Sequence, residues 1–132
     1  MGFRPDIKGR KFVKKMYKGV ISMSLYMFQA SYTAQAIKAL VNNPQNREGP
    51  ARTVIEAAGG KLLSMYFCFG TSDVVAIIEA PDDKAMASCS LAIGASGAFS
   101  SGSTTSIMTA ADAMDAMQAA QAVSAVYKPA TG

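Results

Sequence analysis

The chain has 132 residues, of which 50% are hydrophobic and 17% are charged, and its formal net charge is +4. This length suits one domain with a two-layer core, and the composition excludes a disordered chain. No apolar stretch reaches the ~18–20 residues that a membrane-spanning helix needs, so we predict no membrane partner.

The charge is distributed unevenly along the chain. Residues 1–22 contain seven Lys or Arg and one Asp, whereas residues 23–132 contain six basic and eight acidic residues. We interpret 1–22 as a basic N-terminal extension, 23–127 as the folded domain and 128–132 as a frayed tail. Two alternatives for the extension remain, a secretory signal that ends at an Ala-Gln-Ala cleavage site and an arm that contacts phosphates. Nothing in the chain resembles a helix-turn-helix, so we predict no specific nucleic-acid partner.

Cysteine and histidine content restricts the chemistry that the chain can perform. Histidine is absent, which removes the commonest general base, the commonest transition-metal ligand and every Ser-His or Cys-His pair. Cys68 and Cys89 have no C-x-x-C arrangement, and two cysteines are too few for a metal cage or a disulfide scaffold. We therefore expect reduced thiols, a cytoplasmic location, no metal and no cofactor.

The first part of the domain predicts a strand and an interrupted helix. Residues 23–32 alternate as a strand does, and Thr33 is a favourable N-cap for the helix that follows. Pro44 disfavours an uninterrupted helix, while Pro50 suits the first turn of a resumed one. The paired glycines at 59–60 end this second half.

The middle of the chain predicts two strands and a helix. Residues 61–69 alternate as a strand, and 73–80 are apolar and β-branched on both faces, as in a central strand covered on both sides. The break at 70–73 joins these two strands as a turn. Residues 81–94 then predict a helix, because a proline followed by two aspartates suits a helix N-terminus.

The last part predicts one more strand and one more helix. Residues 99–109 form a polar strand of weaker pattern. Thr109 and Asp112 are spaced as in a capping box, with Asp in place of the usual Glu, ahead of a helix that runs to about 126.

The element order predicts an α+β fold of the ferredoxin-like β-α-β-β-α-β type, with an antiparallel four-stranded sheet, two helices on one face and an added C-terminal helix. The second face of the sheet is too apolar to lie in water. The residues assigned to that face are Tyr26, Phe28, Leu62, Tyr66 and part of 74–78. A second copy is the simplest cover, so we expect a homodimer or higher oligomer, assembled as a dimeric α/β barrel with a cavity between the sheets.

The run GGKLLSMYFCFGTSDVVAIIEAPDDKAMA resembles the GYD domain family, small bacterial and archaeal proteins of the dimeric α/β-barrel type. The resemblance covers about residues 24–110 and includes the SYT that ends the first strand. It implies the same fold and the same dimer, but it brings no settled activity. At the break the family pattern is Gly-x-Tyr-Asp, whereas 70–73 read Gly-Thr-Ser-Asp, so the tyrosine is missing.

These observations give six candidate ligand-binding residues and no catalytic residue. Four aromatic side chains are expected to line the cavity, with two polar residues of the break at its rim: Tyr26, Phe28, Tyr66, Phe69, Ser72 and Asp73. Either Tyr26 or Tyr66 could take the place of the missing tyrosine. The alternative for Asp73 is structural, because Asp in a tight connection bonds nearby backbone.

Three functions remain open. The first is a homo-oligomer without catalytic activity that binds a small apolar or organic ligand between packed sheets. The second is a cofactor-free oxygenase-type enzyme, which would need Tyr, Asp or Glu for proton transfer because histidine is absent. The third is a structural or interaction module. The sequence favours a non-enzymatic protein.

Overall fold

The computed structural model describes residues 22–131, so the basic extension predicted for 1–22 lies, apart from Ser22, outside the described residues. The elements are β1 (Ser24–Tyr32), α2 (Ala34–Asn42), α3 (Glu48–Ala57), β2 (Lys61–Phe67), β3 (Val74–Ala80), α4 (Asp83–Ala95), β4 (Phe99–Ile107) and α5 (Ala110–Ser124). The predicted element order is confirmed, and the first helix is divided into α2 and α3 across Pro44.

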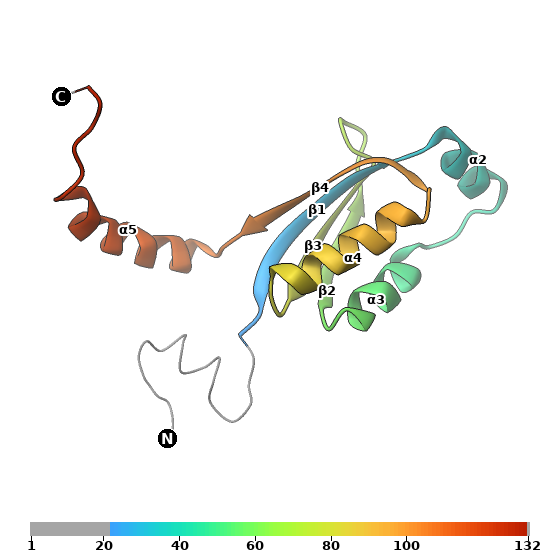
Figure 1. The fold of residues 1–132 in the computed structure, drawn as a ribbon. Helices are drawn as coiled ribbons and strands as arrows, with labels where there is room; N and C mark the ends of the chain where they lie inside the picture. The colour runs from blue at the N-terminus through green and yellow to red at the C-terminus, as the bar shows by residue number, and fades with distance from the viewer. Residues whose placement is uncertain (1–21, 132) are drawn as a thin grey trace, which may run out of the picture.

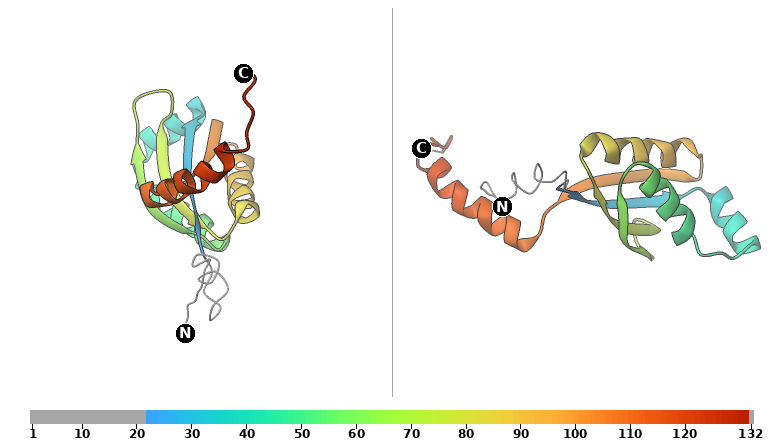
Figure 2. Two further views of the ribbon diagram at one scale, coloured as in Figure 1. Left: turned by 90° about the vertical axis from the view of Figure 1, so that its left-hand side faces the viewer. Right: turned by 90° about the horizontal axis from the view of Figure 1, so that it is seen from below.

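The four strands form one antiparallel sheet in the order β2-β3-β1-β4. Helices α3 and α4 lie side by side over one face of this sheet, as Figures 1 and 2 show, while α2 lies at its end and α5 projects beyond β4. The α+β ferredoxin-like class is therefore confirmed. We call the face opposite α3 and α4 the open face.

Local sequence signals set the helix ends. Thr33 Oγ1 accepts from the Ala36 amide at 3.1 Å at the start of α2, and Thr109 Oγ1 accepts from the Asp112 amide at 3.0 Å at the start of α5. Both threonines are the N-caps that the sequence predicts. Gly59, with a φ of 86°, follows α3 in the left-handed region that glycine tolerates best, so it lets the chain turn back into β2.

The prediction that Tyr26, Phe28 and Leu62 lie on the open face is wrong. All three side chains lie under α3 and α4, with exposed fractions of 3%, 8% and 2%. The alternation of β1 and β3 was predicted correctly, but both faces of these strands are apolar, so alternation separates the faces without saying which one the helices cover.

A bulge in β2 explains the misplacement of Leu62. The pairing register with β3 shifts between Leu62 and Ser64. One extra residue reverses the in–out alternation beyond it, so Leu62 and Met65 share the covered face. Tyr66 then points to the open face and is 65% exposed. The central strands contribute four apolar residues to the same face: Leu25, Met27, Val75 and Ile77.

Tyr26 links the sheet to the first turn of α4. Its hydroxyl donates to Oδ1 of Asp83 at 2.6 Å, from a ring that is buried in the core. Burial, followed by the hydrogen bond to Asp83, raises the pKa of Tyr26 above its ordinary value near 10. Folding therefore favours the neutral, protonated form of the Tyr26 phenol.

We expect Tyr26→Phe to lower the free energy of unfolding by about 1 kcal/mol at pH 7, because it removes one hydrogen bond to an exposed carboxylate that water can solvate again. Since the folded-state pKa lies above the unfolded value of about 10, unfolding releases a proton between these two values. The stability that Tyr26 contributes is thus fully present below pH ~10 and is lost as the pH rises through the folded-state pKa. Urea unfolding from pH 7 to 11.5 should show the two proteins converging; a constant difference would contradict the assignment.

Candidate functional site

A cavity of about 310 Å³ lies between the sheet and the pair α3 and α4. Its floor comes from the covered face of the sheet, through Phe28, Met65, Val74 and Ala76 among others. Its walls come from residues 50–55 of α3 and from the C-terminal half of α4. A hollow of this size and apolar character is the usual form of a small-molecule site.

Four aromatic rings form a continuous group, and three of them line this cavity. The rings of Tyr32 and Phe99 stack at a centroid distance of 4.6 Å, and Phe99 meets Phe28 edge-to-face at 6.4 Å. Phe67 stacks on the other side of Tyr32 at 5.9 Å. Such offset and edge-to-face geometries are the favourable ones for aromatic pairs, so Tyr32 is held between two rings.

A second hollow of about 390 Å³ opens beside the first, under α2. The two hollows share Tyr32, Arg47, Ser96 and Ala98, which therefore mark their junction. Burial raises the pKa of Tyr32, and the nearby Arg47 opposes that rise without cancelling it. The Tyr32 phenol thus stays protonated at neutral pH and can donate a hydrogen bond.

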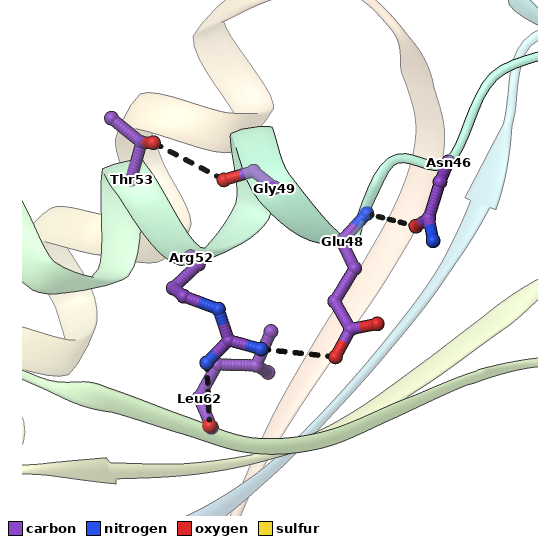
Figure 3. Close-up of polar contacts among 6 residues, drawn as sticks. All are labelled: Asn46, Glu48, Gly49, Arg52, Thr53 and Leu62. Atoms are coloured by element: carbon purple, nitrogen blue, oxygen red, sulfur yellow. Dashed lines mark hydrogen bonds and ion pairs between the residues drawn. The ribbon is translucent and has the colours of Figure 1, made fainter.

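The start of α3 is fixed by a small polar network (Figure 3). Arg52 Nη2 pairs with Glu48 Oε2 at 3.0 Å, and Arg52 Nη1 donates to the Leu62 carbonyl of β2 at 3.2 Å. The Glu48 amide in turn donates to Oδ1 of Asn46 at 2.8 Å. These contacts hold α3 against β2 and so define one wall of the cavity.

The break at 70–73 has a structural role in this fold. Asp73 Oδ2 accepts from the Tyr32 amide at 2.9 Å, and the Asp73 amide donates to the Ala30 carbonyl at 2.9 Å. The Cys68 amide closes the connection on the Asp73 carbonyl at 2.8 Å. Asp73 therefore joins the β2–β3 connection to the end of β1. Gly70 in this connection does not adopt a positive φ, which among the described glycines occurs at Gly59 and Gly97.

The six predicted ligand residues do not meet in one place. Phe28 lines the cavity, while Tyr26 lies in the core and contacts Asp83. Tyr66 lies on the open face, and Phe69 is fully exposed in the β2–β3 connection beside Ser72 and Asp73. The structure thus divides the set between the two faces of the sheet and the connection at its end.

Sequence reasoning missed Tyr32, Arg47 and Phe99. Tyr32 continues the series 26, 28, 30 on the covered face, so the strand periodicity could have placed it with Phe28. Arg47 and Phe99 had no such signal, because they reach the cavity through the path of the α2–α3 connection and the start of β4.

Residues 22–131 contain no cluster for a metal ion and no helix that could cross a membrane. His, Cys, Asp and Glu residues of this part of the chain form no group of three that could hold a metal ion. None of its helices combines the length and the apolar character needed to cross a membrane. Cys68 and Cys89 are both free, and burial raises the pKa of the Cys89 thiol, which makes it a poor nucleophile.

Fold and site together define a ferredoxin-like α+β domain with a hollow under its helices. The family model of the GYD domain matches residues 26–117, so this chain belongs to the GYD domain family. No curated protein matches it. Among solved structures, that of MtbAldR (Rv2779c) is similar with a TM-score of 0.43 and 18% identity, over 65% of this chain and 52% of MtbAldR. This chain therefore spans about half the length of MtbAldR. A similarity of that extent carries no information about what this chain binds.

We expect Asp73→Ala to lower the free energy of unfolding by about 1–2 kcal/mol, because the Tyr32 amide loses a charged acceptor in a half-buried position. Asp73→Asn keeps an acceptor oxygen and should lose less. Guanidinium unfolding measures both. If the two variants are as stable as the natural chain, Asp73 does not hold the connection in place.

Proposed function

We propose that this protein is a homodimeric small-molecule binding protein, in which each subunit holds an apolar ligand between its sheet and its helices. The observation that carries the proposal is the cavity of about 310 Å³ with its aromatic wall of Phe28, Tyr32 and Phe99. Filling such a void with a ligand removes apolar surface from water, at about 25 cal/mol per Å². If the void stayed empty, the side chains that line it would lack van der Waals contacts that close-packed protein cores have.

This location differs from the one that the sequence suggested, between the packed sheets of two copies. On the open face the central strands present apolar side chains, including Met27 and Ile77, which lie opposite one another. Such a surface favours close packing against another apolar surface. The concave space of the subunit lies on the opposite face, which favours the ligand there.

The residues at the cavity favour binding over catalysis. None of the Asp or Glu residues in the described part of the chain lines the cavity. Tyr32 is the acid that does line it, and burial raises its pKa further from neutrality, so it is a poor general base at pH 7. A cofactor-free oxygenase needs such a base, which makes that alternative the weaker one.

A second copy is the proposed cover of the open face. Four strands about 4.8 Å apart and seven residues at about 3.3 Å each give a face of roughly 19 Å by 23 Å. Two such faces bury about 900 Å² in projection, against about 1,200 Å² for the smallest specific interfaces. Helix α5 supplies the difference, because Met114, Met117 and Val123 are exposed on it and it extends beyond the sheet.

We further propose a cytoplasmic location. Cys68 and Cys89 are both free in the fold, and Cys68 is only half-buried. An unpaired, partly accessible thiol persists best in a reducing compartment.

The cavity can be tested by filling it. Val54→Phe adds volume at the α3 wall, so it should reduce binding of the neutral probe N-phenyl-1-naphthylamine at least about tenfold while the free energy of unfolding stays equal or rises by up to about 2 kcal/mol. Fluorescence titration measures the binding, and urea unfolding measures the stability.

The matched control is Val41→Phe, the same change on an exposed position of α2 that lines no part of the cavity. It should leave probe binding unchanged. If both variants bind the probe as the natural chain does, or if the natural chain binds none, the cavity is not the binding site. The structural-module alternative then becomes the better account.

The dimer can be tested with one charge on the open face. Ile77→Lys places a cation opposite Met27 in the middle of that face, and two-fold symmetry would bring two such cations together. We expect native mass spectrometry to show the natural chain at twice its subunit mass and this variant at the subunit mass. Leu91→Lys, an exposed position of α4, is the control and should remain dimeric. A monomeric natural chain would sink the second-copy proposal.

A further inference from the structure

The junction of the two hollows carries one charged side chain. Residues Tyr32, Arg47, Ser96 and Ala98 line both the apolar cavity and the second hollow under α2. Arg47 is the charged residue among all those that line either hollow. A ligand in the apolar cavity therefore meets a guanidinium at the point where the cavity opens.

Among the described residues, no carboxylate pairs with Arg47. Within residues 22–131 its guanidinium donates through Nη1 to Oε1 of Gln45 at 2.7 Å and forms no ion pair. The adjacent acid, Glu48, is turned to Arg52, at 3.0 Å (Figure 3). Arg52 also donates to the Leu62 carbonyl, so Glu48 and Arg52 satisfy each other and Glu48 is not directed at Arg47.

The guanidinium of Arg47 has donors left for a ligand. The residue is partly buried at the N-terminal end of α3, while its hydrogen bond to Gln45 is exposed, so the charged group is accessible from the solvent side. A guanidinium has five N–H donors in a rigid fork, and Gln45 occupies only one direction of that fork. The remaining donors match the two oxygens of a carboxylate better than any neutral group.

We propose that the ligand is a small monocarboxylate with an aromatic or branched apolar body. The carboxylate binds to Arg47 at the junction, and the body lies in the cavity against Phe28 and Phe99. This inference rests on the proposed function, because it names the ligand class of the same cavity. One cation at the mouth of an apolar hollow matches one negative charge, whereas a phosphate dianion would leave charge unpaired.

Tyr32 supplies a second polar contact in this arrangement. It lines both hollows, and its hydroxyl has no hydrogen-bond partner among the described residues. The ring is fixed between Phe67 and Phe99, so the hydroxyl needs little ordering when it donates to a bound anion. Ser96 is less available, because its Oγ already donates to the Ile93 carbonyl at 2.6 Å and accepts from the Ala98 amide.

A matched pair of probes tests the class of ligand. 3-Phenylpropanoate and 3-phenylpropanamide share the apolar body and differ in charge, and each can be titrated calorimetrically into the full-length chain at pH 7. We expect the carboxylate to bind at least about tenfold more tightly than the amide, because a charge-assisted hydrogen bond is stronger than one between neutral groups. Arg47→Gln should remove this preference and leave amide binding unchanged.

Two further variants complete the design. Arg47→Lys keeps the charge without the fork and should retain part of the preference. Lys38→Gln removes one positive charge from an exposed position of α2 that lines neither hollow, and it should behave as the natural chain. Unchanged amide binding in every variant shows that the cavity is intact.

The outcomes separate this inference from the proposed function. If the natural chain binds both probes equally, the carboxylate class is wrong. If Arg47→Gln keeps the preference for the carboxylate, Arg47 is not the residue that binds it. In both cases the apolar cavity stands. If the natural chain binds neither probe, and N-phenyl-1-naphthylamine does not bind either, the proposed function itself is wrong.

Discussion

The division of the first helix at Pro44 is the constraint on which the candidate site depends. A continuous helix would run the length of the sheet, but the break leaves α2 at the sheet end without a buried residue, so that only α3 of these two helices lies on the sheet, beside α4. Near Phe28 and Val74, helices α3 and α4 do not fill all the space above the sheet, and this space is the cavity. The same break carries Arg47 to the mouth of that cavity, so one backbone feature sets both its shape and its charge.

The sequence predicts the element order well because its signals are local. Thr33 and Thr109 cap helices, Pro44 interrupts one, and the alternation of β1 and β3 is regular. The candidate site is predicted poorly because it depends on tertiary choices. Apolar residues on both faces of the central strands hide which face the helices cover, and the bulge after Leu62 reverses the alternation of β2. Only Phe28 of the predicted ligand residues lines the cavity.

The break at 70–73, where this chain lacks the tyrosine of the family pattern, has a structural role. Asp73 uses its carboxylate and its backbone amide to fix the end of β1, where Tyr32 begins the aromatic wall, and its carbonyl accepts from the Cys68 amide within the connection. Its influence on a ligand therefore passes through the position of Tyr32. Phe69 in the same connection is fully exposed, so an aromatic ring in this part of the chain is not by itself a sign of a pocket.

The central claim is that the ligand lies within one subunit, between sheet and helices. Intermolecular nuclear Overhauser effects from the ring protons of bound N-phenyl-1-naphthylamine test this most directly, with the methyl groups of the chain assigned. We predict effects to Val54, Met65 and Ile93, which line the cavity, and none to Met27 and Ile77 on the open face. Effects to Met27 and Ile77 in place of the cavity residues would contradict the account and place the ligand between sheets.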